Sequence, residues 1–365
     1  MAQIRIENLQ KSFGSFTAVK ASTFTVEDGE FFCLLGPSGC GKTTTLRMIA
    51  GLELPTSGTI HLGGDEVAQK RASERDIAFV FQLFALYPHM NVRRNIGFPL
   101  VCEGVDRAAI RERVEETARI LRISHLLDRP VSGLAGGDRQ RVALGRAIVR
   151  KPKCFLMDEP LGALDTELRE AMITELRALH DRLHATTVYV THDQLEAMAM
   201  ADKIAVMNQG VVEQVANAQE IYDRPATLFV ADFIGSPPMN LLPLRASLAP
   251  GQTSIALGEG RITIPAMREG VADTDLVLGV RPEQIRFSEG GALRGEVYGV
   301  EYLGTTQIAT VRTGHGSLRV RAPSSLPVTV GAQVGLEVRP DRVSIFEKAS
   351  GRALRSALHD GAAHG

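Results

Sequence analysis

One short stretch, Gly36-Pro37-Ser38-Gly39-Cys40-Gly41-Lys42-Thr43, constrains the fold of this chain more than any other feature. It matches the phosphate-binding pattern of a glycine, four residues and then Gly-Lys-Ser/Thr. The apolar run Phe31–Leu35 precedes it, and apolar residues at helical spacing follow it as far as Gly51. This order predicts backbone amides at a helix start, where the helix dipole favours an anion. Lys42 adds a positive charge for the β- and γ-phosphates and the Thr43 hydroxyl suits Mg²⁺, so we expect an α/β nucleotide-binding fold.

Length and composition limit the alternatives. A chain of 365 residues is too long for one ordinary core, so two domains are expected. Hydrophobic residues make up 44% and charged residues 23%, which is typical of a soluble globular protein, and the net charge of -1 gives no indication of nucleic-acid binding. No apolar run is long enough to span a bilayer, and no secretory signal is visible. The four cysteines form no CxxC pair, which favours a reduced cytosol.

Two weaker features are also candidates for a nucleotide site. Phe13 precedes a glycine, so its ring is either exposed and able to stack on a nucleobase or packed in a core. Gln82 follows the apolar strand pattern at 77–81, and ligands bind at strand ends in doubly wound sheets. Taken alone, a core phenylalanine and an ordinary loop glutamine are the more frequent interpretations.

A second junction between glycines and a helix occurs later in the chain. Residues 107–123 alternate charged and apolar groups at helical spacing. The stretch Leu134-Ala135-Gly136-Gly137-Asp138 then leads into another helical pattern. It is either a second anion site or a plain glycine turn before a helix.

Two buried-strand patterns end in groups that can carry chemistry. The apolar run at 154–157 ends in Asp158 and Glu159, and paired carboxylates after a buried strand are costly unless they serve a function. Asp158 can reach Mg²⁺, and Glu159 can polarise a water molecule for attack on a phosphate. Residues 187–191 repeat the pattern and end at His192, although a lone histidine there is more often structural.

The order of these motifs resembles the ATPase subunit of an ABC transporter, with Leu161-Gly162-Ala163-Leu164-Asp165 following the acidic pair. The resemblance implies an α/β P-loop NTPase that binds ATP and Mg²⁺ and is active only as a dimer. It implies that Phe13 stacks on adenine and that the phosphates are held by Gly36, Pro37, Ser38, Gly39, Cys40, Gly41, Lys42, Thr43 and Thr44.

The same resemblance assigns roles to the remaining motifs. Gln82 is assigned to Mg²⁺, to the attacking water and to a transmembrane partner. Asp158 joins Thr43 as a metal-side ligand, Glu159 is the catalytic base, and His192 contacts the γ-phosphate. The turn at Ala135, Gly136, Gly137 and Asp138 covers ATP bound to the opposite subunit, and Asp165 couples the two sites.

This turn departs from the family's Leu-Ser-Gly-Gly-Gln at two positions, where Ala135 replaces serine and Asp138 replaces glutamine. Losing a hydroxyl bond to a charged phosphate costs roughly 1.5–3 kcal/mol. Asp138 would repel the phosphate if aimed at it, but would suit the dipole if turned along the first helical turn, which we expect. We expect a working site, with a heterodimer containing an intact second ATPase as the rival hypothesis.

The resemblance extends to the C-terminal part. Residues 233–240 resemble the junction of maltose-importer-type ATPases, and alternating strand patterns after it predict a small β-barrel of the oligonucleotide/oligosaccharide-binding type. We therefore expect an ATPase domain over 1–235 with a helical subdomain near 88–150. An OB-like, TOBE-type regulatory domain would follow over 236–348, with a flexible tail over 349–365.

The resemblance implies the energy-coupling ATPase of an importer, with carbohydrates or polyols such as glycerol first among solutes and polyamines, ferric iron or phosphonates as alternatives. It implies two transmembrane permease subunits, an extracytoplasmic solute-binding protein, no nucleic acid, and a peripheral location on the cytoplasmic face of the inner membrane. A non-transport ABC protein is disfavoured because the sequence shows one ATPase domain and no long heptad run. A module that binds ATP without cleaving it is disfavoured by Glu159.

Overall fold

The computed structural model describes residues 2–82, 84–162, 164–257 and 260–360, and it divides into two compact units, Met1–Ala218 and Gln219–Gly365. The boundary differs from the predicted one after residue 235. Helices α7 (Ala218–Asp223) and α8 (Leu228–Phe233) lie at the start of the second unit, because its buried Arg281 donates to the carbonyls of Tyr222 and Ala231.

The first unit contains two β-sheets. A four-stranded antiparallel sheet has the order β2-β1-β4-β5, with the strands β1 (Ile4–Phe13), β2 (Phe16–Val26), β4 (Ser57–Leu62) and β5 (Asp65–Glu66). A six-stranded sheet has the order β10-β9-β3-β8-β7-β6, with the strands β3 (Phe31–Leu35), β6 (Ile77–Val80), β7 (Cys154–Asp158), β8 (Thr186–Thr191), β9 (Lys203–Asn208) and β10 (Val211–Ala216). All its pairs are parallel except β9 with β10. Every residue of β3 and β8 is buried, as expected for parallel strands covered on both faces.

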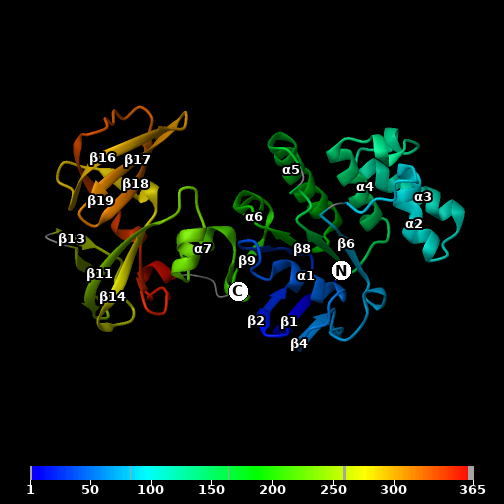
Figure 1. Ribbon diagram of the computed structural model, residues 1–365, viewed down its shortest axis with the longest axis horizontal. Coiled ribbons are helices and arrows are strands. Elements are labelled where there is room, and N and C mark those ends of the chain that lie inside the picture. Colours follow the sequence, from blue (N-terminus) through cyan, green and yellow to red (C-terminus); the bar gives the residue numbers. More distant parts are fainter. Residues whose placement is uncertain (1, 83, 163, 258–259, 361–365) are drawn as a thin grey trace. The chain divides into compact units, whose positions relative to one another are not determined.

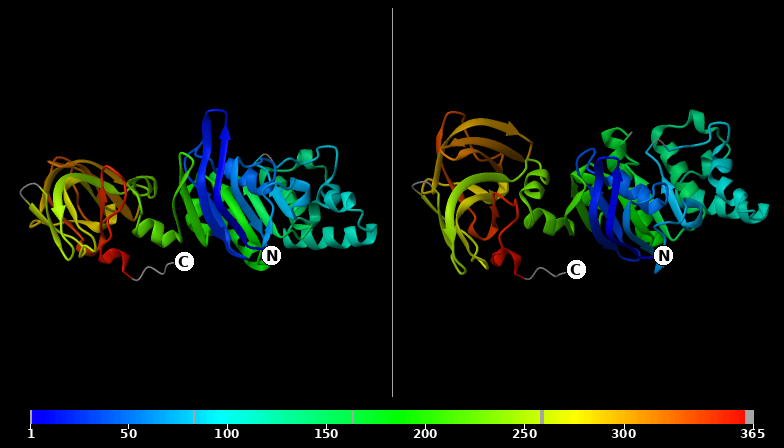
Figure 2. Two further views of the ribbon diagram at one scale, coloured as in Figure 1. Left: turned by 90° about the horizontal axis from the view of Figure 1, so that it is seen from below. Right: turned by 60° about the horizontal axis from the view of Figure 1, so that its bottom comes forward.

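The described residues of this unit also form the α-helices α1 (Lys42–Ala50), α2 (Val92–Cys102), α3 (Arg107–Ile120), α4 (Gly136–Ile148), α5 (Thr166–Leu183) and α6 (Gln194–Met200). Helices α2, α3 and α4 gather beyond the edge strand β6, and the hairpin β1–β2 lies alongside the larger sheet (Figures 1 and 2). The three helices pack closely because Gly97 and Gly145 face their neighbours, and a Cβ on Gly145 would lie 3.1 Å from Leu121. These helices fall within the span predicted for the helical subdomain.

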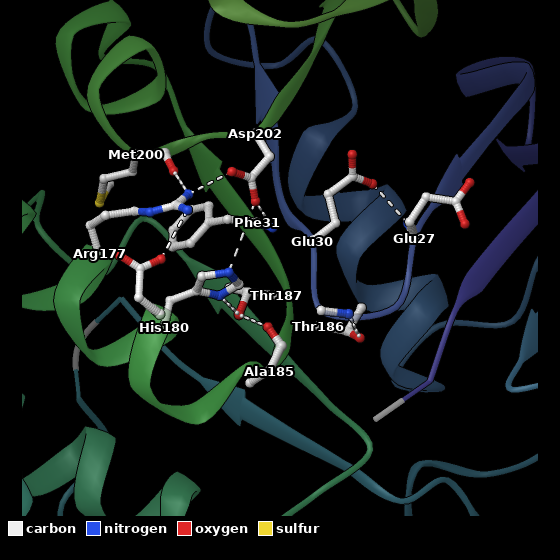
Figure 3. A network of polar contacts seen from close by, with 12 residues as sticks. Glu27, Glu30, Phe31, Arg177, His180, Ala185, Thr186, Thr187, Met200 and Asp202 are labelled. Carbon is white, nitrogen blue, oxygen red and sulfur yellow. Dashed lines mark hydrogen bonds and ion pairs between the residues drawn. The ribbon is translucent and has the colours of Figure 1, made fainter. Parts of the chain in front are cut away.

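A polar network fastens α5 to the start of β3 (Figure 3). Arg177 donates to the Met200 carbonyl at 2.7 Å and to Asp202 Oδ1 at 2.8 Å, and Asp202 Oδ2 accepts from the Phe31 amide at 2.8 Å. The His180 ring packs on Phe31 with centroids 5.1 Å apart, and burial lowers the pKa of His180. The network holds β3 at Phe31, its first residue. The predicted phosphate loop follows the other end of the strand, after Leu35.

Strands dominate the second unit. They are β11 (Asn240–Leu248), β12 (Ser254–Leu257), β13 (Gly260–Thr263), β14 (Val271–Val280), β15 (Ile285–Phe287), β16 (Leu293–Tyr302), β17 (Thr306–Thr313), β18 (Gly316–Pro323), β19 (Gln333–Val338) and β20 (Val343–Glu347). They form three sheets, β11-β14-β20, β12-β13 and β15-β19-β16-β17-β18, whose strands curve around a shared interior (Figure 2). One apolar cluster draws residues from all three sheets, including Leu242, Ile255 and Val297.

The predicted flexible tail over 349–365 is wrong for residues 349–360, and residues 361–365 lie outside the described residues. Leu354 is only 1% exposed within the β core, and its amide donates to the Ile345 carbonyl at 2.7 Å. Arg352 also pairs with Glu269 at 2.9 Å. One buried leucine with paired backbone thus anchors a segment whose composition alone suggested disorder. In the described parts of both units, no helix has the length and apolar character needed to cross a membrane.

Candidate functional site

The predicted phosphate loop connects the end of β3 to the start of α1. Gly41 occupies the N-cap of α1 with φ 106°, and Gly39 has φ 79°, both in the left-handed region that favours glycine. A Cβ on Gly36 would lie 2.2 Å from the Met207 carbonyl oxygen, and one on Gly41 would lie 2.5 Å from that of Ala18. Glycine is therefore required at Gly36 and Gly41 by contact with neighbouring backbone, and the loop wraps tightly over the start of α1.

Lys42 folds back over this loop. Its Nζ donates to the Gly36 carbonyl at 2.8 Å and to the Pro37 carbonyl at 2.9 Å, and the residue is 4% exposed. Burial raises the pKa of the Cys40 thiol, so the neighbouring cysteine stays neutral. Within the described residues the ammonium bonds to carbonyl dipoles and to no carboxylate, so its positive charge is available to an anionic ligand.

Thr43 connects the loop to the predicted acidic pair. Its Oγ1 donates to Asp158 Oδ1 at 2.9 Å, across 115 residues of sequence. Burial raises the pKa of Asp158, the Thr43 hydrogen bond opposes that shift, and the charge of Glu159 adds to it. A hydroxyl and a carboxylate oxygen thus lie together beside the start of α1, where Thr44 is half-buried in the first helical turn.

Glu159 and His192 meet at the ends of neighbouring strands β7 and β8. Glu159 Oε2 lies 3.1 Å from His192 Nδ1, and the two side chains are 20% and 54% exposed. Glu159 adopts φ 43°, which is unfavourable for a residue with a Cβ, and its amide donates to the Val190 carbonyl at 3.0 Å. A strained backbone thus presents this carboxylate at the open end of the sheet.

The structure also brings Gln82 to this edge. Gln82 is exposed just after β6, and its Nε2 lies 3.6 Å from the position of a Cβ on Gly162, three residues after Glu159. Asp165 caps α5 by accepting from the Leu168 amide at 2.9 Å. Ala163, within the same predicted motif, lies outside the described residues.

Phe13 lies at the end of β1, in the hairpin whose second strand passes Gly41 at Ala18. Its side chain is 48% exposed, and Lys11 Nζ lies 4.8 Å from the ring centroid. The exposed alternative of the sequence analysis is therefore the one observed. No hydrogen bond or ion pair of the described residues joins Phe13 to the phosphate loop, so its contact with adenine stays a prediction.

The second glycine junction differs from the first. Ala135 is the N-cap of α4 and offers no side-chain acceptor. Asp138 turns along the helix as expected, and its Oδ1 accepts from Arg141 at 3.2 Å, while Arg141 also pairs with Glu175 at 3.0 Å. The nearest neighbour of a Cβ on Gly137 would be the Leu168 side chain, at 3.1 Å. Within the described residues no hydrogen bond or ion pair joins Ala135, Gly136, Gly137 or Asp138 to the phosphate loop of the same chain.

Sequence reasoning missed three arginines around the site. Arg141 holds Asp138, Arg146 donates to the carbonyls of Phe84 and Ala85 after Gln82, and Arg169 donates to the Leu164 carbonyl at 2.9 Å. The partners of Arg146 and Arg169 are backbone carbonyls, which leave no mark in the sequence, so no local pattern could have identified these contacts. The Asp138–Arg141 pair is different, because its spacing of three residues is typical of an ion pair on a helix.

Comparisons with known proteins agree with this geometry. The ABC transporter family matches residues 19–162, the MalK OB fold domain matches 235–285, and the TOBE domain matches 278–346. The trehalose/maltose import ATP-binding protein MalK of Thermococcus litoralis is 46% identical, over 97% of this chain and 100% of its own length. The sn-glycerol-3-phosphate import ATP-binding protein UgpC of Cereibacter sphaeroides is 45% identical over the same shares. A dimeric bacterial ABC transporter cassette superimposes with a TM-score of 0.53 and 29% identity, over 59% of this chain and 98% of that one.

The ABC transporter match contains both the phosphate loop and the Asp158–Glu159 pair, so the first unit is an ATPase of the ATP-binding cassette class. The near full-length relatives then narrow the assignment. The chain belongs to the import ATP-binding proteins of ABC transporters whose cassette is followed by a MalK-type OB fold and a TOBE domain. This confirms the predicted fold class, an ABC ATPase followed by an all-β OB-like domain.

Proposed function

We propose that this ABC ATPase couples ATP hydrolysis to the import of a carbohydrate or polyol, as a dimer bound to two transmembrane permease subunits. An extracytoplasmic solute-binding protein would deliver the solute, and the ATPase would lie on the cytoplasmic face of the inner membrane. The names of the relatives support this class of solute, since they refer to trehalose, maltose and sn-glycerol-3-phosphate.

The hydrogen bond from Thr43 to Asp158 carries the proposal. It joins the phosphate loop to the end of β7, which Glu159 follows directly, and so brings an anion-binding loop and a candidate base to one edge of the sheet. In this arrangement Lys42 would exchange its bonds to the Gly36 and Pro37 carbonyls for phosphate oxygens. Glu159 would orient and deprotonate water, and His192, 3.1 Å from Glu159, would fix the carboxylate and contact the γ-phosphate.

The residues at this edge fit Mg²⁺. Thr43 and Asp158 supply hard oxygen ligands, and Gln82 supplies a third from the neighbouring strand end. The described residues contain no cluster of three acidic, histidine or cysteine ligands, which suits a metal completed by substrate phosphates and water. When bound, Mg²⁺ would neutralise charge that develops on the phosphates.

The cargo is tested with the complete transporter in proteoliposomes. We expect the solute-binding protein to stimulate ATP turnover when it is loaded with maltose, trehalose or sn-glycerol-3-phosphate, and a Lys42→Ala variant to abolish the turnover. Stimulation only by a polyamine, ferric iron or a phosphonate would overturn the carbohydrate assignment and leave the ATPase intact.

A second candidate is a weakly active half of an ATPase heterodimer, which the absence of an N-cap acceptor at Ala135 favours. We expect the purified protein alone to hydrolyse ATP, with turnover nearly unchanged in Ala135→Ser. Turnover that appears only after a second ATPase with the intact serine motif is added would favour the heterodimer.

A further inference from the structure

The backbone at Phe84 and Ala85 has an unusual conformation. Phe84 and Ala85 have φ values of 60° and 46°, two consecutive left-handed residues that both carry a Cβ. This conformation is unfavourable outside glycine and persists only where the surroundings impose it. The segment therefore needs an external support to hold its shape.

Arg146 of α4 supplies that support. Its Nη1 donates to the Ala85 carbonyl at 2.7 Å and its Nη2 to the Phe84 carbonyl at 3.0 Å. Its guanidinium carbon lies 5.2 Å from the centroid of the Tyr87 ring. The backbone amide of Tyr87 in turn donates to Oδ1 of Asn95, on α2, at 2.9 Å. The rigid planar fork of arginine lets two separate nitrogens donate to the two adjacent carbonyls, a fixed spacing that the single nitrogen of a lysine does not impose.

Arg146 contacts carbonyl groups and an aromatic ring, whereas a surface arginine often pairs with a carboxylate. Burial lowers the pKa of its guanidinium, and no described carboxylate forms an ion pair with it. Arg150, one turn further along, pairs instead with Glu103 at 2.8 Å. A half-buried cation bonded to two carbonyls and lying near an aromatic ring indicates a contact that holds this segment in place.

Helix α4 connects this contact to the twin-glycine turn, Gly136–Gly137, at its N-terminus. Arg146 lies ten residues after Gly136, or about 15 Å along the helix axis. Gly145 packs α4 closely against Ile96 of α2, so the helix moves with its neighbours. We propose that Arg146 is a positioning residue that joins the Gln82 segment of one ATP site to the Gly136–Gly137 turn that serves the other. The inference rests on the proposed function, in which these two motifs face different ATP molecules.

The test compares the full-length variants Arg146→Ala, Arg146→Lys and, as a matched control from the same helix end, Arg150→Ala. For Arg146→Ala we expect kcat to fall about 10- to 100-fold with the ATP dissociation constant changed less than about threefold. Amide hydrogen exchange over 84–90 should accelerate in Arg146→Ala, to a smaller extent in Arg146→Lys, and not in Arg150→Ala.

A double-mutant cycle separates positioning from general stabilisation. If Arg146 acts through Gln82, adding Arg146→Ala to a Gln82→Ala variant should lower kcat less than about twofold further. Additive losses, or unchanged exchange over 84–90 in Arg146→Ala, would overturn the proposal. If Arg146→Ala does not fold, Arg146→Lys is carried through the same cycle. If the wild-type protein shows no ATP turnover, the proposed function is refuted instead. The hydrogen-exchange comparison can still be made in that case, because it does not require turnover.

Discussion

The two glycine-to-helix junctions of the first unit have similar sequences and different structures. At the phosphate loop, backbone contacts exclude any side chain at Gly36 and Gly41, and Lys42 and Thr43 are already bonded within the chain. At the second junction the helix start likewise has no side-chain cap, but the nearest neighbour of a Cβ on Gly137 would be a leucine side chain and not backbone. The first junction is complete within one chain. The second has the character of a half-site.

The largest expected effect tests whether ATP is hydrolysed at the strand end beside the phosphate loop. Replacing Glu159 by glutamine keeps the shape of the side chain and removes the base, so kcat should fall about 10²- to 10⁴-fold while ATP still binds. Steady-state ATPase assays and equilibrium ATP binding measure the two quantities. Turnover within a few-fold of wild type would show that Glu159 is not the base and that the strand end beside the phosphate loop does not carry the reaction.

The next prediction contrasts the two sets of glycines directly. Gly36→Ala would drive a Cβ into the Met207 carbonyl, so it should lower the free energy of unfolding by about 1–3 kcal/mol and weaken ATP binding. Gly137→Ala has helical geometry and a flexible neighbour, Leu168, so its stability should stay within about 1 kcal/mol of wild type. Thermal unfolding of both variants measures the difference, and equal losses would contradict the comparison.

The same contrast explains how much the sequence could predict. The phosphate loop and the Asp158–Glu159 pair were predicted because each motif is contiguous, and pattern and chemistry coincide there. Arg146 and Arg281 could not be predicted, because their partners are carbonyls distant in sequence, and carbonyls carry no sequence signal. Pro243 lies inside strand β11, where a missing N–H is tolerated because β11 is at the edge of its sheet.

Two aspartates provide a pH-dependent test of the comparison. Burial raises the pKa of Asp158, so between the unfolded and folded pKa values the folded state binds more protons. The contribution of this group to stability therefore falls as pH rises through that interval and is lowest at neutral pH. We expect Asp158→Asn, without nucleotide, to raise Tm by a few degrees at pH 7, with the gain shrinking as pH falls toward the raised pKa. The variant should also lose ATP turnover, because it removes the carboxylate that we propose as a ligand of Mg²⁺.

Asp138→Asn is the matched control at the second junction. Asp138 pairs with Arg141 at 3.2 Å, so this variant loses an ion pair and should be slightly less stable, by about 0.2–1 kcal/mol. Tm values of both variants at pH 7 and at lower pH give the comparison. Shifts of the same sign at pH 7 would mean that the two junctions do not differ in the way their contacts indicate.

The smallest expected effect comes from adding a side-chain N-cap to the second junction. Ala135 is the N-cap of α4, and Ala135→Ser places a hydroxyl where it can accept from an amide of the first turn. We expect α4 to gain about 0.5–2 kcal/mol, measured as a rise in Tm, because an orphan N–H group is satisfied.

Ala135→Val is the control for this last change, since it adds side-chain volume without an acceptor and should give no gain. If serine and valine behave alike, the amides at the start of α4 are already satisfied in solution. The amides of the twin-glycine turn would then need no ligand from a second subunit. The contrast between a phosphate loop that is complete in one chain and a turn that is half of a site would no longer hold. If only serine stabilises the chain, the amides of Gly137 and Asp138 remain available to a ligand brought by a second copy of the fold.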